Sequence, residues 1–136
     1  MDLAEARRIV REQPRAVLAT TRADGNPQMS PVLAGVAEDG AILISSRTTA
    51  FKVKNLRRDP RSWLCVLPDA FFGRWIQIEG TATVLELPEA MPGLEDYYRR
   101  VTGEHPDWAE YRAAMESERR VLIRVELTRA GPDRSG

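Results

Sequence analysis

Cysteine and histidine are scarce in this chain, and each shortage excludes a class of site. Cys65 and His105 are the only residues of their kinds among 136. One cysteine cannot form an intramolecular disulfide, and one cysteine with one histidine cannot supply the ligands of a transition-metal site. A Ser-His-Asp set would have to use His105, which lies in a Glu-His-Pro sequence typical of a turn. We therefore expect no metal and no catalysis by this histidine.

Net charge and long apolar runs are absent as well. The formal net charge is zero, which gives no electrostatic reason to expect a nucleic-acid partner. No apolar run approaches the roughly 20 residues that a membrane-spanning helix needs. The segment 1–8 is amphipathic and lacks the apolar core of a signal peptide. We expect a cytoplasmic protein without a membrane span.

The chain does have enough apolar sequence for one hydrophobic core. Apolar residues make up 43% of it, and its length suits a single domain, which we place at residues 1–129. Residues 130–136 are mainly glycine, proline and charged residues. We expect this tail to be disordered.

Alternation of apolar and polar residues is the dominant pattern. It is clearest over 74–86, where Ile76 and Ile78 fall on one face of a strand and Trp75 and Gln77 on the other. The predicted strands are 15–21, 29–37, 41–46, 62–67, 74–86 and 119–128, and the predicted helices are 2–13, 48–59, 89–101 and 107–118. Mostly hairpin connections between the strands predict a mainly β fold, a six-stranded antiparallel barrel with peripheral helices.

The only two lysines, Lys52 and Lys54, lie in the segment 47–60, directly after a predicted strand. A helix opened by Thr48 or Thr49 would present free backbone amides at its start, and Lys52 could reach an anion bound there. The same pattern fits a surface helix with a solvated basic face. The residues alone leave both interpretations open.

Four motifs, taken in order, resemble a known family. They are Arg15-Ala-Val-Leu-Ala-Thr20, Asp24-Gly-Asn-Pro-Gln28, Lys52-Val-Lys-Asn-Leu-Arg-Arg-Asp-Pro-Arg61 and Ile78-Glu-Gly-Thr-Ala82. Together they resemble the split β-barrel flavin and deazaflavin oxidoreductases, the relatives of pyridoxamine 5'-phosphate oxidase. The segment 103–115 is similar to the actinobacterial branch that uses the deazaflavin coenzyme F420. The resemblance implies a six-stranded split β-barrel of the FMN-binding type, which forms a homodimer with the cofactor at its interface.

The resemblance also implies the cofactor contacts. Lys52 matches the lysine that contacts the cofactor phosphate, and Gln28 and Ser30 match positions that face the ring or its side chain. Arg74 is placed to neutralise the acidic tail of F420. The full expected set is Gln28, Ser30, Val32, Ser45, Ser46, Arg47, Lys52, Lys54, Arg74, Trp75 and Gln77.

Two positions depart from the family pattern. Ala50 and Phe51 stand where relatives carry arginine, so we expect Arg47 or Lys54 to compensate. The loss at Phe51 favours F420 over FMN, because the phosphomonoester of FMN carries more charge and gains more from a second cation. Large aromatic residues clustered in the sequence are expected either at the dimer interface or inside the monomer's own barrel. The candidates are Trp63, Phe71, Phe72 and Trp75.

The function that the resemblance implies is hydride transfer from reduced F420 to a small organic acceptor. No catalytic side chain is expected, because the cofactor carries the reactive carbon. Two alternatives remain: an FMN-dependent oxidase or reductase of the same fold, and a deazaflavin-binding carrier without turnover.

Overall fold

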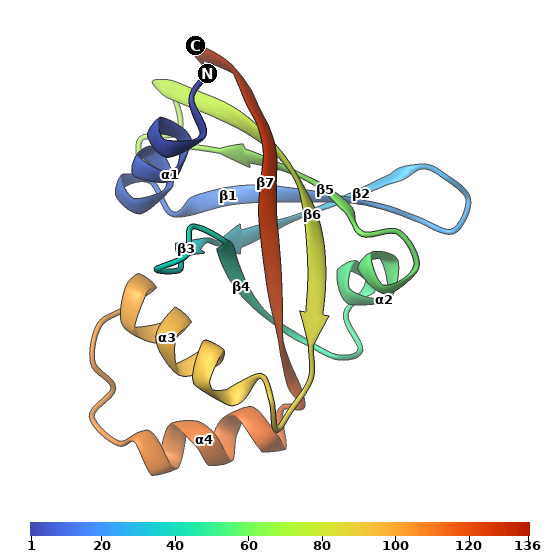
Figure 1. The fold of residues 1–136 in the computed structure, drawn as a ribbon, viewed down its shortest axis with the longest axis vertical. Coiled ribbons are helices and arrows are strands. Elements are labelled where there is room, and N and C mark those ends of the chain that lie inside the picture. Colours follow the sequence, from blue (N-terminus) through green and yellow to red (C-terminus); the bar gives the residue numbers. More distant parts are fainter.

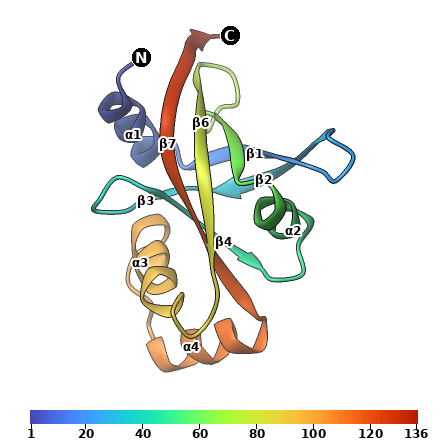
Figure 2. The ribbon, with the colours of Figure 1, turned by 45° about the vertical axis from the view of Figure 1, so that its right-hand side comes forward.

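The computed structural model describes all residues, 1–136, as a curled antiparallel sheet with four helices (Figures 1 and 2). The strands are β1 (Arg15–Thr21), β2 (Pro27–Leu33), β3 (Gly35–Val36), β4 (Ile42–Arg47), β5 (Arg61–Val66), β6 (Arg74–Leu85) and β7 (Arg120–Ser135). The helices are α1 (Leu3–Glu12), α2 (Phe51–Arg58), α3 (Met91–Val101) and α4 (Trp108–Ser117).

The sheet closes on itself because of how its edges are connected. The strand order is β2-β1-β5-β6-β7-β4-β3, so β2 and β3 are the two edges. Only Ala34 separates these edge strands in the sequence, and its amide donates to the Pro14 carbonyl 2.8 Å away. Two opposite edges joined by one residue force the sheet to curl. The result is a split barrel, as the sequence predicted.

One hydrophobic core fills the inside of the curl. Alternate residues of the strands contribute to it, and α1 and α2 close it with their apolar faces. Its fully buried large side chains include Ile9, Leu18, Ile42, Ile44, Val53, Leu64, Ile76, Ile78 and Ile123. A second, smaller cluster lies on the other face of β4 and β7, under α3 and α4. Its buried residues are Ala37, Leu43, Ala90, Leu94, Tyr111, Met115 and Leu122.

The alternation read from residues 74–86 is confirmed in β6. Ile76, Ile78 and Ala82 are buried, whereas Trp75 and Gln77 remain half-buried on the outer face. Strand β6 pairs with β5 on one side and with β7 on the other. It therefore forms part of the barrel wall.

Two expectations about the strands are corrected. The predicted strand 29–37 is two strands, because residues up to Leu33 pair with β1 and residues from Gly35 pair with β4. The last strand continues to Ser135, so residues 130–136 are not a disordered tail. Strand β6 supplies the pairing partner, and the Arg74 guanidinium donates to both carboxylate oxygens of Asp133, at 2.9 and 2.8 Å. Composition alone missed this pairing because the partner strand is distant in sequence.

None of the four helices combines the length and the apolar character that crossing a membrane requires.

Gly80 marks the tightest contact between β6 and β7. A Cβ atom at this position would overlap Val125 Cγ1 and would lie 2.6 Å from the Glu126 carbonyl oxygen. The ladder also shifts register between Glu79 and Gly80. Glycine is therefore required here because the two backbones approach too closely for a side chain.

We predict that Gly80→Ala lowers the free energy of unfolding by about 1–3 kcal/mol, the usual cost of overpacking. Urea denaturation measures the change. The control is Thr83→Ala, an exposed position on the same strand, which should cost less than about 1 kcal/mol. Equal effects of the two substitutions would show that the close approach is not a constraint.

Candidate functional site

Helix α2 begins later than its sequence suggested. Its N-cap is Ala50, which makes no side-chain capping hydrogen bond, and the expected cap Thr48 instead accepts a hydrogen bond from the Arg57 guanidinium at 3.1 Å. The amides of Phe51 and Lys52 make no backbone hydrogen bond within the chain. The start of α2 therefore offers two free N–H donors, although the threonines do not define it.

Lys52 is the least satisfied cation in this region. It lies in the first turn of α2, half-buried, and its ammonium has no hydrogen-bond or ion-pair partner in the chain. Burial lowers the pKa of this ammonium, and the positive charge of Arg120 lowers it further. A half-buried lysine beside an arginine is electrostatically unfavourable until an anion neutralises it. The start of α2 is therefore the candidate anion site of this structure.

The end of β4 supplies hydroxyls to two different faces. Ser46 is 5% exposed and lies on the barrel side of the strand with Ile44, whereas Ser45 lies on the opposite side with Leu43. Arg47, on the same side as Ser45, forms an ion pair of 3.3 Å with Glu118. Adjacent residues of a strand point apart, so the expected pair of serines does not act on one group together.

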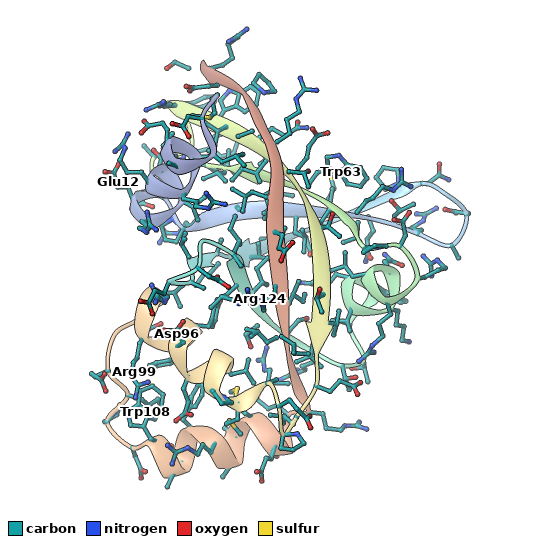
Figure 3. The ribbon with its side chains drawn as sticks, in the orientation of Figure 1. Glu12, Trp63, Asp96, Arg99, Trp108 and Arg124 are labelled. Atoms are coloured by element: carbon teal, nitrogen blue, oxygen red, sulfur yellow. The ribbon has the colours of Figure 1, made fainter.

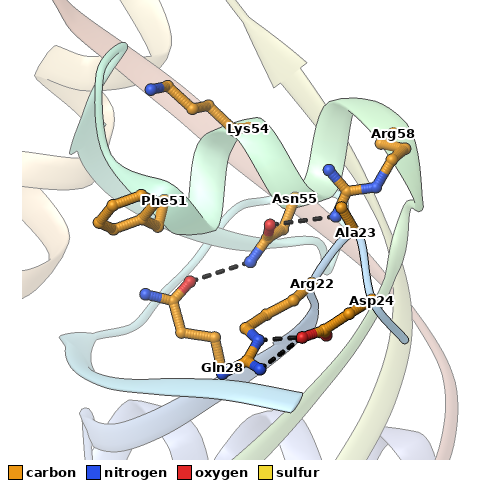
Figure 4. A pocket seen from close by; sticks show the side chains of 8 residues that line it. All are labelled: Arg22, Ala23, Asp24, Gln28, Phe51, Lys54, Asn55 and Arg58. Atoms are coloured by element: carbon orange, nitrogen blue, oxygen red, sulfur yellow. Dashed lines mark hydrogen bonds and ion pairs between the residues drawn. The ribbon is translucent and has the colours of Figure 1, made fainter. Parts of the chain in front are cut away.

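A cavity of about 560 Å³ lies between α2 and the β1–β2 hairpin (Figure 4). It is lined by Arg22, Ala23, Asp24, Gln28, Phe51, Lys54, Asn55 and Arg58. Gln28 and Lys54 were expected to contact a cofactor. The Lys54 ammonium lies 5.7 Å from the centre of the Phe51 ring, and Arg22 is held by Asp24 at 2.6 Å. Lys54 and Arg58 form no ion pair with an acidic side chain, and Arg58 is held instead by the Thr21 carbonyl and by Asn55 Oδ1.

Asn55 is the residue of this site that sequence reasoning missed. It is 6% exposed, and its amide donates to Thr20 Oγ1 at 3.0 Å and to Gln28 Oε1 at 2.9 Å. Its carbonyl oxygen accepts from the Arg58 guanidinium at 3.1 Å. A polar residue on the apolar face of a predicted helix was the available signal, because buried polar groups are there to make hydrogen bonds.

The polar residues of β2 lie where their alternation predicted. Gln28, Ser30 and Val32 are half-buried on the barrel side, and the residues between them are exposed. Val32 packs against the main core, and Gln28 borders the cavity. The strand therefore presents its polar end, not its apolar end, to α2.

Trp75 and Gln77 lie on the outer face of the sheet, opposite to the side that carries Gln28. Arg74, at the start of β6, is already neutralised by Asp133 and by Glu5 at 3.5 Å. Arg74 stands at one end of β6. Six residues, or roughly 20 Å of extended strand, separate it from Gly80 in the middle of that strand. One copy of the chain therefore does not bring the expected contacts on β6 together with those on β2 and α2.

His105 is part of an aromatic cluster between α3 and α4. Its ring centre lies 5.0–5.7 Å from those of Tyr98, Trp108 and Tyr111, and its Nδ1 accepts the Asp107 amide at 2.9 Å. Figure 3 shows Trp108 beside Arg99 at this end of the molecule, and the Arg99 guanidinium carbon lies 4.3 Å from the tryptophan ring centre. Packing and helix capping account for this histidine.

Comparisons with known proteins agree with this architecture. The family model described as pyridoxamine 5'-phosphate oxidase matches residues 3–131. The conserved hypothetical protein Rv2991 of Mycobacterium tuberculosis is 28% identical, with a TM-score of 0.75 over 96% of this chain and 82% of that one. An F420 reductase is 19% identical, with a TM-score of 0.71 over 91% and 94% of the two chains. A related FMN-binding protein of Nostoc punctiforme is 14% identical, with a TM-score of 0.67 over 93% and 80%.

The unfavourable burial of the Lys52 charge makes the free energy of unfolding depend on pH. The pKa of Lys52 is lower in the folded chain than its unperturbed value of 10.5, so between the two values the unfolded state binds more protons and stability rises with pH. Below that window the folded state carries the full penalty. We predict that Lys52→Met is more stable than the parent at pH 7 and that this advantage disappears as the pH rises towards 10.5.

Urea denaturation of both proteins across this pH range, without ligand, makes the comparison. Inorganic phosphate should stabilise the parent and have little effect on Lys52→Met. A parent that is more stable than the variant at pH 7 without any anion would contradict the assignment of Lys52 as an unpaired cation.

Proposed function

This chain belongs to the pyridoxamine 5'-phosphate oxidase family, and we propose that it is an oxidoreductase that binds coenzyme F420 and uses the reduced coenzyme to reduce a small organic acceptor. The observation that carries the proposal is the unpaired Lys52 ammonium at the start of α2. The charge of Arg120 is near enough to lower the pKa of this ammonium, and the amides of Phe51 and Lys52 at the same end of the helix make no backbone hydrogen bond. Cations and directed N–H donors together suit a phosphate group.

The donor set fits the phosphate diester of F420. Lys52 would bind the phosphate, and the amides of Phe51 and Lys52 would add hydrogen bonds along the helix axis. The hydroxyl of Ser46, near the end of β4, would be a further donor to the cofactor. When bound, the cofactor supplies the hydride. The chain's own task is to fix the ring and to exclude water above it.

The residues around the phosphate favour F420 over FMN. Ala50 and Phe51 provide no charge, so Lys52 and the more distant Arg120 have to hold the anion. A singly charged diester needs less compensation than a phosphomonoester. Lys54, on the exposed side of α2, has no acidic partner and can add positive charge to hold the cofactor. Arg47 is occupied by Glu118 and compensates less than the sequence suggested.

The split of the expected contacts over two faces supports a homodimer. The outer face of β2, β1, β5 and β6 carries half-buried or exposed apolar groups. They include Val17, Met29, Pro31, Leu33, Trp63, Cys65 and Trp75. If two copies pair through this face, Trp75 and Gln77 of one copy can approach the α2 site of the other. Phe71 and Phe72, 62% and 73% exposed, extend the same surface.

Equilibrium titration with oxidised F420 and with FMN tests the cofactor. We predict tighter binding of F420, and a loss of about 1.5–3 kcal/mol of F420 binding free energy in Lys52→Met, the range for hydrogen bonds to charged groups. Tighter binding of FMN would show that the cofactor is FMN. F420 binding that is unchanged in a folded Lys52→Met would show that Lys52 does not hold the phosphate.

Turnover is tested separately, with reduced F420 and a panel of enones, quinones and nitroaromatic acceptors. Oxidation of the cofactor, followed by absorbance, is the expected result. Tight binding without oxidation for any acceptor would favour a carrier of the cofactor over an enzyme.

The dimer has a test of its own. We predict that Val17→Glu weakens self-association by more than tenfold, because it places an unpaired charge in the proposed interface, and that F420 affinity falls with it. Light scattering at several protein concentrations measures the association. Ala113→Glu, on an exposed position of α4, is the matched control and should leave both properties unchanged. A Val17→Glu variant that is still a dimer would exclude the outer face as the interface.

A further inference from the structure

The hydrogen bonds around Asn55 run in one direction, from α2 towards the cavity. Arg58 donates to Asn55 Oδ1 at 3.1 Å, and Asn55 Nδ2 donates to Gln28 Oε1 at 2.9 Å (Figure 4). The second proton of the Asn55 amide goes to Thr20 Oγ1 at 3.0 Å. The Asn55 side chain therefore has its two donors and its acceptor engaged.

The direction of this chain of bonds follows from its first member. A guanidinium can only donate, so the atom of Asn55 that faces Arg58 must be the carbonyl oxygen. Arg58 is itself anchored, because it donates to the Thr21 carbonyl at 2.8 Å. If the Asn55 amide were reversed, its NH₂ group would face the guanidinium, donor against donor. The Asn55 NH₂ group consequently faces Gln28.

Gln28 has no choice of orientation either. Because Asn55 offers it a donor, Gln28 must turn its carbonyl oxygen towards Asn55. Its NH₂ group is then directed away from Asn55, as Figure 4 shows, and makes no hydrogen bond within the chain. Gln28 is one of the residues that line the cavity. The cavity is thereby given a fixed hydrogen-bond donor.

We propose that Arg58 and Asn55 are positioning residues that fix Gln28 as a hydrogen-bond donor to the bound cofactor. The atom that meets Gln28 must then be an acceptor, such as a ring carbonyl oxygen, and a ring N–H is excluded from this position. Arg58 contributes through Asn55 by polarising the hydrogen bond that follows. The identity of the ligand in this proposal rests on the proposed function. The hydrogen bonds from Arg58 to Asn55 and from Asn55 to Gln28, called the relay below, exist in the ligand-free chain.

Substitutions at Gln28 test whether its hydrogen bond to the cofactor must run in one direction, or whether contact with the cofactor is enough. Gln28→Ala removes the donor and should weaken F420 binding about fivefold, the value of one ordinary hydrogen bond. Gln28→Glu keeps the shape but places an acceptor opposite an acceptor, and should weaken binding at least tenfold more than Gln28→Ala. The control is Ala113→Glu, which adds the same charge at an exposed position of α4 outside the cavity. It should change the affinity by less than about threefold in high salt, where surface charges are screened.

Asn55→Asp reverses the direction of the hydrogen bond between residue 55 and Gln28 without changing Gln28 itself. The new carboxylate still accepts from Arg58, and the Thr20 hydroxyl can rotate to donate to it. Gln28 must then turn its NH₂ group towards Asp and present its oxygen to the cavity. We expect a loss of F420 affinity similar to that of Gln28→Glu, with little change in the melting temperature. If Asn55→Asp fails to fold, the Gln28 pair still decides the question.

Side-chain amide resonances of the ¹⁵N-labelled ligand-free protein test the relay independently of any cofactor. The Asn55 NH₂ protons should exchange slowly with solvent and the Gln28 NH₂ protons rapidly. Protected Gln28 protons, or Gln28→Glu binding F420 no worse than Gln28→Ala once the Ala113→Glu effect is removed, would overturn the proposal. A parent chain that binds neither F420 nor FMN would refute the proposed function, while the exchange experiment would still decide whether Gln28 is fixed as a donor.

Discussion

The pairing of β6 with β7 is the interaction on which the rest of the molecule depends. These are the two longest strands, and they pair from Arg74 and Ser135 at one end to Leu85 and Leu122 at the other. Strand β6 carries β5, β1 and β2 on its free side, and β7 carries β4 and β3. Without this ladder the sheet separates into two halves. Because α3 and α4 lie between the two strands in sequence, the ladder also sets where the smaller hydrophobic cluster forms.

Helix α2 supplies most of the residues of the candidate site. Although it is short, its side chains point to several different sides. Val53 and Leu56 anchor it to the barrel core, which leaves the remaining positions little freedom. Lys52 then lies within reach of the charge of Arg120, while Lys54 and Arg58 line the cavity. The helix thus separates a place for a compact anion from a place for a larger polar group. Helical periodicity alone fixes that division.

The amino-acid sequence predicted those features of the structure that depend on the local pattern of apolar and polar residues. The alternation over 74–86 gave the inner and outer faces of β6, and the alternation of Gln28, Ser30 and Val32 gave the face of β2. The strand formed by residues 130–135 was not predictable from its glycine and proline, because its order comes from a partner more than fifty residues away.

The missed parts of the site have a related cause. Asn55 acts through a hydrogen bond to β1 and another to β2, and no sequence spacing encodes those contacts. The expected roles of Arg47 and Arg74 were altered by acidic partners, Glu118 and Asp133, that only the folded chain brings near. Residue type therefore indicated the kind of site, and tertiary structure decided which charges remain available.

The open edge of β2 has a consequence for behaviour at high concentration. The Leu33 carbonyl points away from β1, where it accepts a hydrogen bond from the Tyr97 hydroxyl at 2.9 Å. Pro27 and Pro31 share the phase of Leu33 along the strand, so the positions that would offer amides to a further strand carry proline instead. An added strand would find too few donors to continue the sheet. The molecule can keep an unpaired edge in solution without growing edge to edge into filaments.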